Sequence, residues 1–159
     1  EQAVSPVIAV ILMVAITVVL AAVLYVWASS FLGGTTKNAP TGSMIASEDG
    51  SGVWTIQLVK INPQVSVNSV HWYLLDVQGN TKTDALVSDV YGYYSGQGKA
   101  VVFIDNDFNG KLSPGDKFEV HPGEADSDLA SVSDVSDYSF RMKFEPTGDV
   151  IGYDIGLQS

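Results

Sequence analysis

The sequence contains no cysteine, which excludes disulfide bonds, thiolate nucleophiles and thiolate metal sites. Charge is missing from one long stretch, because no Asp, Glu, Lys or Arg occurs between Gln2 and Thr36. The eight basic residues are outnumbered by 18 acidic ones, and the formal net charge of -10 belongs almost wholly to the chain from Lys37 onward. Such an acidic surface repels a phosphate backbone, so nucleic-acid binding is not expected.

Residues that carry catalysis are also scarce. The two histidines are His71, inside a predicted strand, and His121, beside Pro122. Neither stands near a nucleophile or metal-ligand motif, so we expect structural or surface roles for both. The sequence has no G-x-S-x-G elbow, phosphate loop or dinucleotide fingerprint. It therefore predicts a protein that is not an enzyme and requires no cofactor.

The uncharged stretch predicts one long helix. Residues 7–32 are almost all Val, Ile, Leu, Ala or Met, and as a helix they would span roughly 39 Å, more than the hydrocarbon core of a bilayer. Ser5 is expected to cap the helix and Pro6 to take its first position, where no amide is needed. Gly33 and Gly34 are expected to end it.

Apolar residues occur on every face of this helix, so it must be surrounded by lipid or by other helices. Tyr25, Trp27 and Phe31 gather toward its C-terminal end, where they would lie at a membrane interface or pack on the following domain. Ile16 lies near its centre. Small residues recur at intervals of about two turns, and we expect them to lie near one face that allows close helix approach. These are Ala9, Ala15, Ala21, Ala22 and Ala28.

The segment 1–27, and above all its core SPVIAVILMVAITVVLAA from Ser5 to Ala22, closely resembles the N-terminus of mature archaeal type IV pilins. The resemblance implies a precursor that a prepilin-type peptidase cleaves before Glu1, consistent with a chain that begins with Glu where Met is expected. It implies further that the helix holds the chain in the membrane until assembly machinery moves it into a filament. Bacterial type IV pilins usually carry Glu where this chain has Ser5, so the pairing attributed to that Glu is not expected.

From this resemblance we expect a homopolymeric extracellular filament, used for adhesion or cell contact, with the helices at its centre. Two alternatives remain open. One is a single-span membrane anchor that carries a β-sandwich binding module. The other is an archaellin-like motility filament, which the core segment favours less.

Beyond a turn-rich linker at 35–42, the period of the apolar residues changes to two, and residues 43–159 are predicted to form a β-rich head. The whole chain is thus expected to be α+β, a hydrophobic helix at 1–34 followed by an antiparallel sandwich of immunoglobulin-like size. Seven strands are predicted, at residues 53–61, 69–77, 86–94, 99–104, 117–120, 138–144 and 150–155.

Residues 105–116 carry the best local motif. The spacing of oxygen ligands around Gly110 is that of a calcium loop, although a shorter Asp stands where the last ligand is usually Glu. The expected ligands are Asp105, Asp107, Asn109, the Lys111 carbonyl and Asp116, and Ser113 would hold a water. The alternative is a solvated Asn-Gly hairpin without a metal. Tyr91, Tyr93 and Tyr94 are similarly open to two interpretations, as adhesion contacts or as ordinary strand packing.

Overall fold

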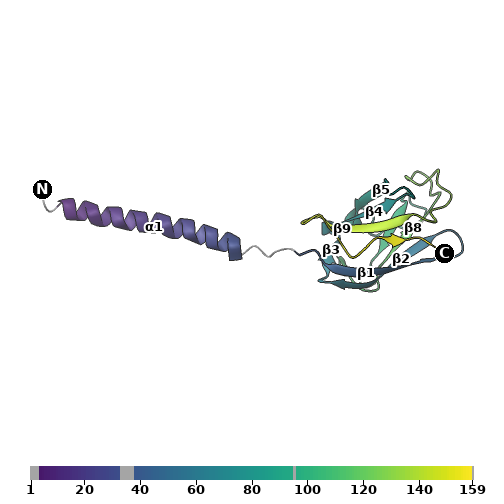
Figure 1. Ribbon diagram of the computed structural model, residues 1–159, viewed down its shortest axis with the longest axis horizontal. Helices are drawn as coiled ribbons and strands as arrows, with labels where there is room; N and C mark the ends of the chain where they lie inside the picture. Colours follow the sequence, from purple (N-terminus) through teal and green to yellow (C-terminus); the bar gives the residue numbers. More distant parts are fainter. Residues whose placement is uncertain (1–3, 33–37, 95, 159) are drawn as a thin grey trace. The chain divides into compact units, whose positions relative to one another are not determined.

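The computed structural model describes residues 4–32, 38–94 and 96–158. The chain divides into two compact units, Glu1–Lys37 and Asn38–Ser159. One long apolar helix followed by antiparallel sheets confirms the α+β class (Figure 1). Gly33 and Gly34 lie outside the described residues.

Helix α1 spans Val4–Leu32. It begins earlier than expected, so Ser5 is a helical residue and not the cap. Pro6 still lies in the first turn, where the backbone amides have no partner within the helix, so its missing N–H costs nothing. The Thr17 hydroxyl donates to the Met13 carbonyl oxygen at 2.8 Å. This side chain is thereby satisfied within the helix.

The second unit contains a four-stranded sheet, in the order β1-β2-β8-β6. These strands are β1 Thr41–Glu48, β2 Trp54–Asn62, β8 Lys117–Val120 and β6 Val101–Ile104. Strand β1 begins two residues before the end of the expected linker, because Thr41 pairs with Asn62 in the β1–β2 ladder. Thr41 and Gly42, the last two residues of the expected linker, therefore belong to β1.

A second sheet has the order β10-β9-β4-β5, with β11 paired to β9. Its strands are β10 Asp149–Val150, β9 Ser139–Phe144, β4 Val70–Leu75, β5 Thr81–Leu86 and β11 Ile155–Gly156. The short strands β3 Val65–Ser66 and β7 Lys111–Leu112 pair separately. Every ladder between these strands is antiparallel.

The two larger sheets meet through their buried side chains. In β9, Phe140, Met142 and Phe144 are buried, while the residues between them are half-buried, as the alternating pattern predicts for a strand with one wet face. Phe118 of β8 packs on Phe140, with ring centroids 4.9 Å apart. The core therefore lies between the sheets and within the second unit.

Two strand predictions were wrong. Residues 86–94 contain a 3-10 helix, η2 Val87–Asp89, in which the chain turns to bury Val87 and Val90 three positions apart. Residues 150–155 are divided between β10 and β11 by a turn in which Gly152 has a φ of 73°. A Cβ at Gly152 would collide with the backbone of Gly42. A second 3-10 helix, η1 Val67–Ser69, precedes β4.

Candidate assembly helix and candidate metal centre

Helix α1 presents apolar side chains to its surroundings on all sides. Its segment Ser5–Ala28 is long and apolar enough to cross a membrane, and no part of that segment is buried within the chain. Ile16, near the middle, is 52% exposed. Since exposed apolar surface of this extent is unfavourable in water, the helix requires a covering of lipid or protein.

We expected the five alanines to lie near one face of the helix, but they do not. At about 100° per residue, Ala15 and Ala22 point in one direction, while Ala21 and Ala28 point in another. Ala9 points in a third. Small residues are thus spread around the helix, which lets close neighbours approach from more than one side.

The expected calcium loop connects β6 to β8, which pair with each other from Val101↔Val120 to Ile104↔Lys117. Its second half is fixed to β2 by two backbone hydrogen bonds of 2.8 Å, from Leu58 N to the Asp116 carbonyl oxygen and from Gly115 N to the Leu58 carbonyl oxygen. Leu112 anchors the loop in the core. The second half of the loop is therefore held against the domain, and the loop is not a solvated hairpin along its whole length.

Three carboxylates converge in this loop. Asp105, Asp107 and Asp116 each offer an oxygen, and these oxygens all lie within 4.8 Å of one another. Because calcium–oxygen bonds are about 2.3–2.6 Å long, ligands on opposite sides of one ion are about 5 Å apart. The spacing of the three carboxylates therefore fits a single calcium ion. Asp105 and Asp116 are buried, whereas Asp107 is exposed.

Hydrogen bonds orient the first and last carboxylates. Asp105 Oδ2 accepts the Gly110 N–H at 2.9 Å, which closes the loop at the glycine that the motif requires. Asp116 accepts the Asn106 N–H at 2.9 Å and the Ser113 N–H at 2.7 Å. Both side chains are thus preorganised, and each keeps further lone pairs for a ligand.

The other two expected ligands are arranged less directly. Asn109 Oδ1 accepts the Lys111 N–H at 2.7 Å, and Asn109 Nδ2 donates to Asp107 Oδ2 at 2.6 Å. The Asn109 amide thus presents its NH₂ group to the carboxylates and would have to turn to offer its oxygen to a cation. Lys111 lies in β7, opposite Ser66. The Ser113 hydroxyl contacts both Asp107 and Asp116, at 3.1 and 3.2 Å.

The two buried carboxylates differ in their proton affinity. Burial, and then the nearby charge of Asp105, raise the pKa of Asp116 above its usual value despite its hydrogen bonds. Burial also acts to raise the pKa of Asp105, but hydrogen bonds, first that from Gly110, outweigh it and lower this pKa. Burial thus disfavours the charged form of Asp116, and a nearby cation would favour it.

Tyr91 belongs to this site although the motif does not contain it. Its hydroxyl donates to Asp105 Oδ2 at 3.2 Å, and burial followed by the Asp105 charge raises its pKa. A bridge between Tyr91 and Phe103 of β6 brings it there. No local sequence signal marks such a contact, because it depends on tertiary pairing.

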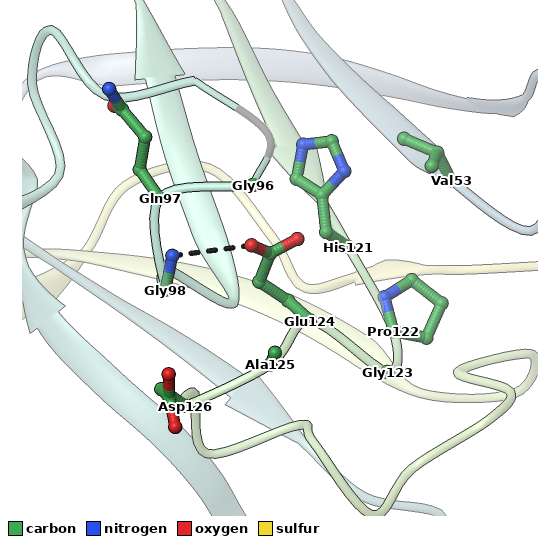
Figure 2. Close-up of a pocket in the computed structure, with 10 residues that line it drawn as sticks. All are labelled: Val53, Gly96, Gln97, Gly98, His121, Pro122, Gly123, Glu124, Ala125 and Asp126. Atoms are coloured by element: carbon green, nitrogen blue, oxygen red, sulfur yellow. Dashed lines mark hydrogen bonds between the residues drawn. The ribbon is translucent and has the colours of Figure 1, made fainter.

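An open depression lies elsewhere on the domain (Figure 2). The Gly98 N–H donates to Glu124 Oε1 at 3.2 Å across it, and His121 forms part of its wall. His121 is buried, with its Nε2 atom 3.3 Å from Glu119 Oε2. His71 instead pairs with Asp84 at 2.7 Å and Glu145 at 3.2 Å. Among residues 4–32, 38–94 and 96–158, neither histidine joins a cluster of three potential metal ligands.

Known proteins resemble this chain in its N-terminal region. Residues 2–43 match the family described as archaeal type IV pilin, N-terminal. No curated protein matches the chain. The match includes all of α1 and ends within β1, so it covers the uncharged apolar helix. The N-terminal region of this chain therefore matches that of archaeal type IV pilins.

Proposed function

We propose that the chain is a structural subunit that polymerises through α1 into an extracellular type IV pilus-like filament. The observation that carries this proposal is a 29-residue helix without a charged residue, in which the side chains from Ser5 to Leu24 are all exposed. In the filament, the α1 helices of neighbouring copies cover one another at the centre. The β-rich units face outward and provide adhesion or cell contact. The role is structural and involves no catalytic step.

The same surface accounts for the stages before assembly. Lipid covers α1 while the subunit waits in the membrane, and other copies cover it afterwards. Burial of one large aliphatic side chain contributes roughly 1.5–3 kcal/mol, so many such residues together hold the helix in an apolar environment at each stage. A prepilin-type peptidase and a pilus assembly machinery are the further partners that the pilin family implies.

The two alternatives are a single-span anchor for a β-sandwich binding module and an archaellin-like motility filament. An anchor leaves each subunit separate in the membrane, whereas both kinds of filament produce polymers. The family match of residues 2–43 supports the pilin over the other two. Electron microscopy of material sheared from cells separates filament from anchor, and a motility assay separates the two filaments.

A charge at the helix centre provides the decisive experiment. Ile16→Lys places an unpaired ammonium where lipid or neighbouring helices must surround it, at a cost of several kcal/mol. We expect no filaments from this variant by negative-stain microscopy. Val59→Lys is the matched control, because Val59 in β2 is also 52% exposed but lies on the head. Normal filament yield from Ile16→Lys would contradict assembly through a buried helix.

We also propose that the loop at 105–116 binds calcium. Support comes from three carboxylates that lie close enough to share one ion, two of them buried and held by backbone hydrogen bonds. Bound calcium would be held by Asp105, Asp107 and Asp116, with Asn109 and the Lys111 carbonyl as the remaining expected ligands. It would stabilise the head and take no part in a reaction. Thermal unfolding with calcium and with chelator tests the proposal.

A further inference from the structure

A groove lined by aromatic rings adjoins the acidic loop. Its volume is about 340 Å³, and its lining includes Tyr91, Tyr93, Tyr94, Phe103, Asp105 and Phe108. This aromatic groove lies between the segment that follows η2 and the first half of the loop at 105–116. Pockets for small ligands begin at about 300 Å³ and combine apolar walls with a few polar groups. The aromatic groove therefore has the size and composition of a small-ligand site.

Phe108 combines a highly exposed ring with an unfavourable backbone conformation. Its side chain is 85% exposed, and its backbone is in the left-handed region with a φ of 54°. That conformation is unfavourable for a bulky residue, and burial does not offset the cost here. Tyr94 is also 67% exposed. Two large rings are thus held at the surface of the same groove without a packing role that accounts for them.

An acidic residue lines the groove. Asp105 is among its lining residues, and the Asp105 carboxylate accepts a hydrogen bond from the Tyr91 hydroxyl at 3.2 Å. The chain as a whole carries a formal net charge of -10, which raises the local concentration of cations. One ring of the groove is already in contact with a cation of the chain, because Lys99 Nζ lies 4.9 Å from the centroid of the Tyr93 ring, so a cationic ligand would have to bind at the other rings. Ring faces and a carboxylate are therefore complementary to the same kind of ligand.

We propose that the aromatic groove binds a small organic cation with a quaternary ammonium group. Aromatic faces attract such a group through their quadrupoles, and its methyl groups cover the apolar walls. Asp105 supplies the opposite charge. A neutral sugar would also stack on exposed rings and would donate hydrogen bonds to the carboxylate, but it would gain nothing from the net negative charge of the surface.

The test uses choline and its uncharged isostere 3,3-dimethylbutan-1-ol as probes. The full chain is titrated in non-ionic detergent with chelator present, so that no calcium competes for Asp105. From typical ligand efficiencies, we expect choline to bind with a dissociation constant of about 1–30 mM. The isostere should bind about tenfold more weakly, because it has the shape but not the charge.

Phe108→Gly tests the ring, because glycine adopts the native φ without strain. It should weaken choline binding about fivefold without lowering the melting temperature. Tyr153→Ala is the control, since Tyr153 is 60% exposed and does not line the groove; its affinity should be that of the unmodified chain. Equal binding of the isostere, unchanged affinity of Phe108→Gly, or no choline binding at about 100 mM would each overturn the proposal. Tighter binding of a methyl glycoside than of choline would also overturn it.

Discussion

The rings of Phe118 and Phe140 lie 4.9 Å apart at an angle of 48°, and they join β8 of one sheet to β9 of the other. Both side chains are fully buried. Phe103 of β6 also packs on Phe118, and the centroids of these two rings lie 4.9 Å apart. This stack spans the core of the second unit without any residue of α1.

Because the core cluster among the described residues is built from residues of the second unit, a fragment Asn38–Ser159 should fold alone as a soluble, monomeric β domain. Circular dichroism and light scattering would measure its secondary structure and mass. An unfolded or insoluble fragment would show that α1 contributes to the folding of the head.

Within that fragment, Phe118→Ala should lower the free energy of unfolding by about 3–5 kcal/mol, because it leaves a cavity between the sheets. Urea denaturation measures the change. Val59→Ala, on the exposed side of β2, should change stability by no more than about 0.5 kcal/mol. Equal losses from both variants would contradict the packing described here.

Gly152→Ala should be more destabilising than Gly148→Ala. Both glycines have positive φ, of 73° and 74°, so alanine costs about 1–2 kcal/mol of backbone strain at either position. A Cβ at Gly152 would additionally collide with the backbone of Gly42, whereas nothing lies within 4 Å of one at Gly148. Similar losses in urea denaturation would show that the two chain segments separate easily.

Calcium should raise the melting temperature of the fragment, and chelator should reverse the effect. At ten times the dissociation constant, the ion adds about 1.4 kcal/mol to the free energy of unfolding. Asp107→Asn should remove most of this response, because it removes one of the three converging carboxylates. Asp149→Asn is the matched control, since it removes one exposed charge outside the loop. If both variants respond like the unmodified fragment, calcium merely screens an acidic surface.

Asp116 should make stability depend on pH when calcium is absent. Its pKa is raised in the folded state, so the folded chain binds this proton more tightly than the unfolded chain, whose Asp pKa is about 3.9. The contribution is fully present below about pH 3.9 and is lost as pH rises through the folded pKa. Relative to Asp116→Asn, the unmodified fragment should therefore lose stability over that interval. The lost acceptor in the variant gives only a constant offset, and a flat difference would contradict the raised pKa.

Sequence patterns predicted the elements that have one buried face and one wet face. In β9, Phe140, Met142 and Phe144 alternate with polar residues, and β2 alternates from Trp54 to Leu58 in the same way. The strands β1 and β5 were missed because they lie at sheet edges. In β1 only Met44 is buried, so the alternation that marks a strand is absent from the sequence.

The candidate metal site was predicted in part. Spacing along the chain correctly brought together Asp105, Asp107 and Asp116, because a loop of fixed length around Gly110 determines their separation. It did not predict the burial of Asp116, which follows from the backbone hydrogen bonds to Leu58. Nor did it predict the aromatic groove, because Tyr91 and Phe108 meet only after β6 has found its place in the sheet.

The hydrogen bond from Thr17 to the Met13 carbonyl satisfies the hydroxyl near the middle of α1. Since no other polar side chain occurs between Pro6 and Leu24, this part of the helix would keep its side-chain hydrogen bonding unchanged in the proposed exchange of lipid for protein. Lipid tails are as apolar as leucine, so the exchange depends on packing alone. In the filament that we propose, the middle of α1 would thus pass from lipid to protein without breaking a side-chain hydrogen bond.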